Sequence, residues 1–358
     1  KPKDYQNYIE KTYNEIDNRL NITNTISNGS YTVCIKQNGE GFSKCNGILV
    51  NRFKETADYK QGILFFIKDV GNKRIWVNTP IDETNRGDKY NISFSPEKDK
   101  FVRIDGDIET TSKIVVSPDE PVEIRRLELK NNGIQEKTLE ITNYFEPVLS
   151  KPMQDYAHMA FNNLFLIFEK LSDDNILVKR KKRGTNEQDF YMGTSFYTEH
   201  ETIGDFEFEI DKEKFLGKRK ELIPEMVKYS KPYSQNMGLV TDPCLAMKRT
   251  IKILPGEKVV FDLIICVSKD KEIIEKLLDK YKNTKVITKT FDLAQAKVEA
   301  ESIYLGLKGV DIERYQKLLS YIIFNNPLKK LILSKLPKRI YSQSKLWKYG
   351  ISGDLPII

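Results

Sequence analysis

The sequence is poor in histidine and cysteine, and this scarcity excludes several kinds of site. It has two histidines, His158 and His200, among 358 residues, so a multi-histidine metal centre is excluded. Its four cysteines show no CxxC spacing, and none has a histidine or cysteine close enough in sequence to complete a zinc site. We therefore expect no metal, and we expect buried thiols in a reducing compartment.

Long apolar runs are also missing. No stretch of 18 consecutive apolar residues occurs, which argues against a membrane-spanning helix. Residues 1–30 contain no apolar stretch followed by a small-residue cleavage site, so we expect no secretory signal there. These absences predict a cytoplasmic location.

The common catalytic motifs are absent as well. The chain has no GxSxG, P-loop, HExxH or Rossmann fingerprint. The glycine-rich stretch GEGFS, residues 39–43, lies between strand-like runs, which favours a β-turn over a phosphate-binding loop. His158 precedes an apolar run, and we interpret it as an ordinary core or loop residue rather than a catalytic one.

The charges are nearly balanced. There are 58 Lys and Arg against 51 Asp and Glu, for a net charge of +7. The densest basic run, KRKKR at residues 179–183, could form an anion-binding patch, but a solvated loop tip between strands is the favoured interpretation. We expect no nucleic-acid partner.

The hydrophobic pattern changes along the chain. Residues 4–20 carry apolar side chains at spacings of three and four, which predicts an amphipathic helix in an N-terminal segment, residues 1–25. From about residue 30 to 267 the segments are short, alternating and separated by turns. Two hairpins are expected, around residues 131–133 and 255–256, with a β-bulge near residues 125–126. The return strand of the second hairpin is nearly all apolar, so both of its faces should be buried.

Helical spacing returns after residue 268. Apolar stripes over residues 273–281, 293–307 and 312–323 predict three helices, and the last should end before Pro327. Strands followed by helices indicate a mainly β fold with α. We expect a large antiparallel β-sandwich over residues 26–268 and linker helices over residues 269–340.

Several segments resemble a known family. LWKYGISGDLPII, residues 346–358, resembles the segment that opens the catalytic barrel of glycoside hydrolase family 94, formerly glycosyltransferase family 36. The stretches at residues 26–53, AHMAFNNLF at 157–165 and FLGKRK at 215–220 are similar to the family in the same order. The resemblance is greatest to the β-1,2-glucan branch, which contains 1,2-β-oligoglucan phosphorylases and cyclic β-1,2-glucan synthases.

This resemblance implies an architecture and a chemistry. The sandwich would be a supersandwich of the galactose-mutarotase type, and residues 341–358 would begin a truncated (α/α)6 catalytic barrel. The parent enzyme would phosphorolyse or synthesise β-glucan with inversion, using inorganic phosphate as co-substrate and no cofactor, and would release glucose 1-phosphate. The family's general acid lies deep in the barrel, so no catalytic residue is expected in this chain.

The resemblance also implies a substrate-binding set near the C-terminus: Asp354, Ser352, Gly353, Lys348 and Trp347. The Asp354 carboxylate would accept hydrogen bonds from sugar hydroxyls. Lys348 stands where the family has arginine, and lysine cannot bind an anion in bidentate geometry. From the residues alone, Asp354 is equally a helix N-cap followed by an early proline, and Trp347 is equally a packing residue.

Two hypotheses for function follow. The first is an N-terminal, non-catalytic portion of a β-glucan enzyme whose partners are β-glucan oligosaccharide, the C-terminal catalytic barrel and a second copy in a homodimer. The alternative is a stand-alone carbohydrate-binding or oligomer-assembly module. A protein of the first kind would be cytoplasmic, or would lie at the cytoplasmic face of the membrane if fused to a synthase.

Overall fold

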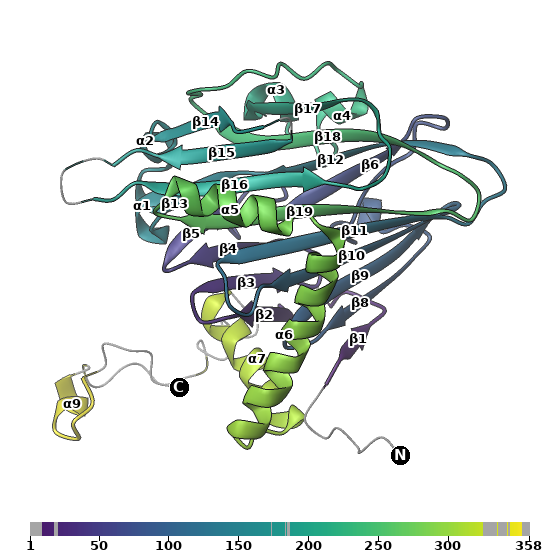
Figure 1. Cartoon of the computed structure of the whole chain (residues 1–358). Coiled ribbons are helices and arrows are strands. Elements are labelled where there is room, and N and C mark those ends of the chain that lie inside the picture. Colours follow the sequence, from purple (N-terminus) through teal and green to yellow (C-terminus); the bar gives the residue numbers. More distant parts are fainter. Residues whose placement is uncertain are drawn as a thin grey trace, which may run out of the picture.

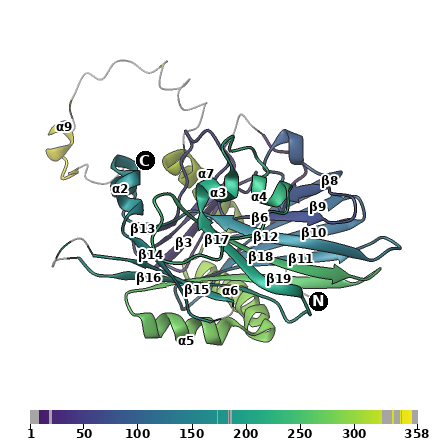
Figure 2. The same ribbon diagram turned by 90° about the horizontal axis from the view of Figure 1, so that it is seen from above.

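The computed structural model describes residues 9–17, 21–172, 174–182, 184, 187–324, 335, 342 and 344–352. It confirms the predicted fold class, a large antiparallel β-sandwich followed by helices (Figures 1 and 2). One layer is a nine-stranded sheet. In spatial order its strands are β1 (Lys11–Tyr13), β8 (Lys89–Phe94), β9 (Lys98–Asp105), β10 (Ile108–Val116), β11 (Val122–Asn131), β19 (Lys258–Ser268), β16 (Phe190–Tyr197), β15 (Asn175–Arg180) and β14 (Leu166–Lys170).

Two five-stranded antiparallel sheets form the second layer. The first contains β17 (Ile203–Asp211), β18 (Pro243–Ile253), β12 (Lys137–Phe145), β6 (Leu64–Asp69) and β7 (Ile75–Val77). The other contains β13 (Pro147–Ser150), β5 (Ile48–Asn51), β4 (Gly41–Cys45), β3 (Tyr31–Lys36) and β2 (Thr23–Ser27). The main hydrophobic core fills the space between the two layers, with side chains such as Leu127 and Phe261 on one side and Val33 and Met247 on the other.

Helices cover the outer faces of both layers. Figures 1 and 2 show α5 against the nine-stranded sheet and α3 and α4 on the opposite side of the molecule. The helices are α1 (Pro152–Ala157), α2 (Met159–Asn163), α3 (Lys212–Leu216), α4 (Glu225–Lys228), α5 (Lys271–Tyr281), α6 (Thr284–Tyr304), α7 (Gly309–Ile323) and α9 (Ser344–Trp347), with a 3₁₀ turn at Glu83–Asn85. No helix among the described residues is long and apolar enough to cross a membrane.

The strand β19 is buried on both faces, as predicted from its nearly continuous apolar sequence. Phe261 and Leu263 point into the core between the layers, whereas Ile264 and Cys266 pack beneath α5. All four cysteines are buried free thiols, which also agrees with the prediction. Burial raises the pKa of the Cys266 thiol to about 12 and that of the Cys45 thiol to about 11.

The two predicted hairpins are wrong. Strands β11 and β19 belong to the nine-stranded sheet, whereas β12 and β18 pair with each other in the second layer. Both turns therefore carry the chain between layers, and they meet at one end of the sandwich. The amide of Gly256 donates to the carbonyl of Asn131 at 2.8 Å, and the amide of Asn131 donates to the carbonyl of Glu257 at 3.0 Å. Turn residues mark such a connection as well as they mark a hairpin.

The predicted bulge in β11 is also wrong. The strand pairs in unbroken register with β10 and β19 through Arg125 and Arg126. Val122 and Ile124 face the helical layer and Leu127 and Leu129 face the sandwich core, so the apparent phase slip is a change of buried face. Because both faces are covered, apolar residues are allowed on either side.

The predicted N-terminal helix is wrong where the structure describes it. Residues 11–13 form β1 and residues 23–27 form β2, and Tyr13 packs at the edge of the core against Phe94. Pairing with β8 supplies backbone hydrogen bonds that override the helical spacing.

The linker helices appear as α5, α6 and α7. The basic run begins in β15, where Lys179 pairs with Asp189 and the buried Arg180 bonds to Asn162, and Lys181 and Lys182 follow the strand without regular structure.

A buried carboxyl gives the fold a specific pH dependence. Asp99 in β9 is fully buried, and its Oδ1 accepts a hydrogen bond from Asn24 at 2.9 Å while the structure shows no partner for Oδ2. Burial raises the pKa of Asp99 to about 7, although Asn24 and Arg125 act in the opposite direction. The folded protein therefore holds a proton that the unfolded chain releases near pH 4. This group costs stability as pH rises from about 4 to about 7.

We predict that Asp99→Asn removes this loss. The free energy of unfolding of the unmodified protein should fall by a few kcal/mol more than that of the variant between pH 5 and pH 8, since each unit of pKa shift is worth about 1.4 kcal/mol. Urea unfolding at the two pH values measures the difference. Parallel pH profiles for the two proteins would show that Asp99 is ionised in the folded state.

Candidate functional site

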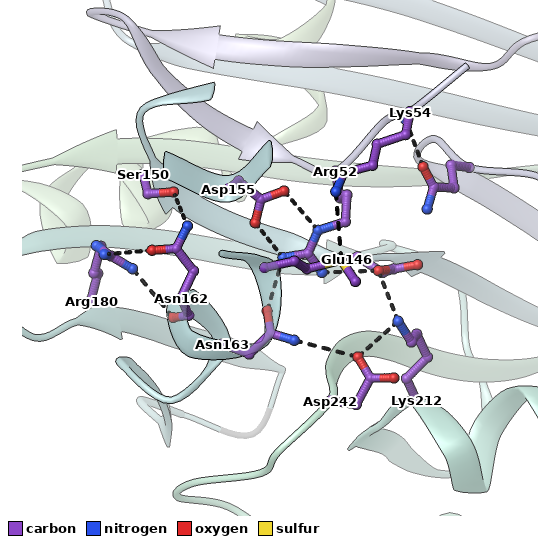
Figure 3. Close-up of polar contacts among 12 residues, drawn as sticks. Arg52, Lys54, Glu146, Ser150, Asp155, Asn162, Asn163, Arg180, Lys212 and Asp242 are labelled. Carbon is purple, nitrogen blue, oxygen red and sulfur yellow. Dashed lines mark hydrogen bonds and ion pairs between the residues drawn. The ribbon is translucent and has the colours of Figure 1, made fainter. Parts of the chain in front are cut away.

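A buried ionic cluster joins the second layer to α1 and α2 (Figure 3). At its centre is Arg52, which follows β5 and is 1% exposed. Its Nε and Nη2 donate to the two carboxylate oxygens of Asp155 in α1, at 3.0 and 2.6 Å. Its Nη1 donates to Glu146 at 3.1 Å, and Nη2 also donates to Asn163 in α2 at 2.8 Å. One guanidinium thus fastens three separate segments, with the bidentate geometry that only arginine provides.

Glu146, in the short link between β12 and β13, is the second centre of this cluster. Its carboxylate accepts hydrogen bonds from Tyr59 at 2.6 Å, Tyr144 at 3.1 Å and Lys212 at 3.2 Å. Lys212 also pairs with Asp242 at 2.8 Å. The cations Arg52 and Lys212 therefore neutralise the buried carboxylates of Glu146 and Asp155, as burial of charge requires.

The titration behaviour of the cluster follows from this pairing. Burial alone would lower the pKa of Arg52, but its bonds to Asp155 and Glu146 outweigh burial and raise it. The same balance raises the pKa of Lys212, chiefly through Glu146. Burial and the Glu146 carboxylate raise the pKa of Tyr59 to about 12. The two cations at the centre of the cluster, Arg52 and Lys212, therefore stay charged at neutral pH.

The backbone beside the cluster is strained. Leu149 in β13 is fully buried and has φ of 52°, in the left-handed region that costs a non-glycine residue about 1–2 kcal/mol. The pairing of β13 with β5 is irregular over the same residues. Farther along, Asn162 in α2 donates to Ser150 at 3.1 Å and accepts from Arg180 at 3.1 Å. Strain that is held by a polar network marks a candidate functional site.

The helices α1 and α2 are inverted in polarity. Their buried residues are polar, namely Asp155, Asn162 and Asn163. Their large apolar side chains, with that of the following Leu164, are between 37% and 74% exposed. We call this set the α1–α2 surface: Met153, Tyr156, Met159, Phe161 and Leu164. Exposed apolar residues this close together mark an interaction surface rather than a scatter of single residues.

The α1–α2 surface lies near the point where α7 ends. Phe324, directly after α7, packs on Phe53 with ring centroids 5.9 Å apart. The neighbouring Lys54 lies 5.6 Å from the ring of Tyr156, and its Nζ is 3.9 Å from the sulfur of Met159. Phe324 therefore lies one residue contact away from this surface, through Phe53 and the adjoining Lys54.

The substrate-binding residues predicted near the C-terminus are only partly described. Gly353 and Asp354 lie outside the described residues. Trp347 ends α9, and its indole Nε1 donates to the carbonyl of Ser352 at 3.1 Å, whereas Nζ of Lys348 lies 4.7 Å from the ring of Tyr349. The Trp347 side chain is 64% exposed, so its ring is available to a ligand. Their role in sugar binding stays a prediction.

Sequence reasoning found parts of this site without finding the cluster. The stretches containing Arg52 and residues 157–165 were selected for their family resemblance, but their contact was not predicted. The available signal was the inverted pattern of residues 152–164, in which the fully buried positions are all polar. His158 is an exposed residue between the two helices, in agreement with its interpretation as a loop residue. No metal-binding group of three acidic, histidine or cysteine side chains occurs among the described residues.

Comparisons with known proteins give a family and one relative. The family model described as glycosyl hydrolase 94, supersandwich domain, matches residues 6–284. The chain is 26% identical over 344 residues to the cyclic β-(1,2)-glucan synthase NdvB of Rhizobium meliloti strain 1021. The match covers 93% of this chain but 12% of the synthase.

Solved structures with some likeness include a putative kojibiose phosphorylase from the human microbiome, with TM-score 0.41 and 8% identity over 87% of this chain and 37% of that one. A bacterial glucoamylase complexed with acarbose has TM-score 0.42 and 12% identity, covering 81% and 40% of the two chains. At these scores the likenesses carry no argument.

We predict that the ionic cluster is essential to the stability of α1 and α2. Replacing Arg52 by methionine should lower the free energy of unfolding by about 3–5 kcal/mol, because it leaves the buried Asp155 carboxylate without a cation. The free energy of unfolding of Arg52→Lys should lie between those of Arg52→Met and the unmodified protein, since lysine keeps the charge and loses the bidentate geometry.

The matched control for this test is Tyr156→Ser on the exposed side of α1, which should change stability by no more than about 0.5 kcal/mol. Denaturant unfolding measures all three variants. Equal stability of Arg52→Met and the unmodified protein would contradict the account.

Proposed function

Because the chain belongs to the glycosyl hydrolase 94 supersandwich family, we propose that it is the N-terminal, non-catalytic portion of an enzyme that makes or degrades β-glucan. The identity to a cyclic β-(1,2)-glucan synthase supports β-1,2 linkages as the substrate class. The chain covers a small share of that relative, which is consistent with a role as one part of a longer enzyme.

In this proposal the α1–α2 surface packs against the helical catalytic barrel of the same enzyme. The observation that carries it is the inverted polarity of α1 and α2. Their apolar side chains face outward, while their buried polar side chains bond to Arg52. A covered apolar surface of this kind would form the centre of an interface. The position of Phe324, directly after α7, supports the barrel as the occupant, because Phe324 packs on Phe53 and the adjoining Lys54 contacts Tyr156 of the surface.

The chemistry of the parent enzyme is inverting phosphorolysis or its reverse. Phosphate attacks the anomeric carbon as an anion, so a single general acid suffices to protonate the leaving oxygen. We place that acid in the barrel. Asp354, with Ser352, Gly353, Lys348 and Trp347, would contact the sugar at the barrel's entrance, and no cofactor or metal is required. The alternative role, as a separate carbohydrate-binding or assembly module, would use the same surface without the barrel.

We also place the enzyme in the cytoplasm, or at the cytoplasmic face of the membrane if it is fused to a synthase. Four buried free thiols fit a reducing compartment.

The proposed function is tested by the double variant Tyr156→Ser, Phe161→Ser in the longer enzyme. Loss of two apolar anchors from the interface should reduce release of glucose 1-phosphate from β-1,2-glucan and phosphate by at least about tenfold. The isolated chain should release none. The control variant is Ile134→Ser, whose side chain is 93% exposed on the turn between β11 and β12 and is not part of the α1–α2 surface.

Two results would contradict the proposal. Full activity of the double variant would show that the α1–α2 surface does not pack against the catalytic part. Turnover by the purified isolated chain would show that the general acid lies within it.

A further prediction concerns Asp354. In the longer enzyme, Asp354→Asn should raise KM for the glucan or lower kcat by about tenfold or more, because a neutral amide accepts weaker hydrogen bonds from sugar hydroxyls. Thermal unfolding should be unchanged. Unaltered kinetics together with reduced stability would identify Asp354 as a helix cap.

A further inference from the structure

A cavity of about 280 Å³ lies between α7 and the edge of the sandwich. Its apolar walls come from residues on β1, β2, β8 and α7 or next to them, with Ile9, Tyr13, Ile22 and Phe94 facing Ile312 and Tyr321. It is about twice the size of the engineered apolar cavity that binds benzene. It lies away from the Arg52 cluster, and the proposed function makes no use of it.

Helix α7 fills only part of this space with large side chains, namely those of Ile312 and Tyr321. The residues it turns toward the cavity include Gly309, Gln316 and Ser320, which are small or polar. The larger Tyr315 and Ile322 are 54% and 43% exposed on the other side of the helix. A helix that packs on a core normally turns its largest apolar residues inward, so this orientation leaves a gap.

Polar contacts hold α7 at this distance from the sheet. The side-chain amide of Gln316 bonds to both backbone groups of Thr25 in the edge strand β2, accepting from its N–H at 2.9 Å and donating to its carbonyl at 2.8 Å. Gln316 thereby satisfies the two backbone groups of Thr25 that a further strand would pair with at this edge of the sheet. An ion pair between Lys11 and Glu313 joins β1 to the same helix. The gap is therefore maintained by directional bonds rather than left by loose packing.

The rim of the cavity carries a net positive charge. Among the residues that the structure describes, the charged ones lining it are Lys11, Glu313 and Lys317, and Glu313 also pairs with Lys317 at 2.9 Å. These lysines hold the pKa of Glu313 at about 2, so the carboxylate stays ionised and the rim keeps a charge of +1. Apolar walls below a cationic rim suit a molecule with an apolar body and a single negative charge.

We propose that this cavity binds a small amphipathic anion, with its hydrocarbon portion between α7 and the sheet and its anionic group at Lys11 and Lys317. A medium-chain carboxylate of eight to ten carbons, a number set by the roughly 0.3 nm³ available, has the required shape and charge. Because the walls come from both the sandwich and a linker helix, the bound molecule would fasten α7 to the sandwich.

The test uses decanoate as the probe and isothermal titration calorimetry with the whole chain. Decanoate should bind with a Kd below about 1 mM, and neutral 1-decanol should bind more weakly. Lys317→Glu reverses the sign of the rim charge. It should weaken decanoate binding by at least about threefold and leave 1-decanol binding unchanged.

Cavity-filling variants locate the site. Ile312→Trp from the helix and Ile22→Trp from the sheet should each weaken decanoate binding by at least about tenfold, and circular dichroism checks that they remain folded. Because the two substitutions lie on opposite walls of the cavity, the test remains valid if one of the variants fails to fold. The control is Tyr315→Ser on the outer side of α7, which should bind like the unmodified protein. Absence of binding at about 1 mM, or binding that is unchanged in a folded cavity-filling variant, would overturn the proposal.

Discussion

The structure depends on the requirement that a buried charge be paired. Arg52 is almost fully enclosed, so its guanidinium must find carboxylates and carbonyl-type oxygens inside the protein. It finds them on Asp155, Glu146 and Asn163, which come from α1, the β12–β13 link and α2. This pairing draws the polar sides of two short helices inward. Their apolar sides are then left on the outside, and the α1–α2 surface is the direct consequence.

The same arrangement recurs in α7. That helix is joined to the sandwich by Gln316 and Glu313, and it turns Tyr315 and Ile322 outward. In both places polar bonds attach a helix to the sandwich while some of its large apolar residues stay exposed. The sandwich itself has a continuous core between its layers, and β11 and β19 are covered by this core on one face and by helices on the other. The sandwich therefore has a filled core of its own, while α1, α2 and α7 expose large apolar side chains, as the proposed packing against a catalytic part requires.

The general architecture could be predicted from the sequence because it depends on local periodicity. Alternation marked the strands, and spacings of three and four marked α5, α6 and α7. The partners of the strands could not be predicted, since residues 131–133 and 255–256 look like hairpin turns whether the next strand returns to the same sheet or crosses to the other layer. The N-terminal spacing was overruled by pairing of β1 with β8. The ionic cluster depends on contacts such as Arg52 with Asp155, 103 residues apart, which no local pattern records.

The central claim is that α1 and α2 direct their apolar side chains outward, where the catalytic part of the enzyme covers them. Methionine oxidation by dilute peroxide, followed by peptide mass spectrometry, measures this directly. Met153 is 74% and Met159 is 37% exposed, while Met192 and Met247 are fully buried and serve as internal controls. The account predicts fast oxidation of Met153 and Met159 in the isolated chain and at least about tenfold slower oxidation in the longer enzyme, with the controls slow in both. Equal oxidation of Met153 and Met159 in the two proteins would contradict it.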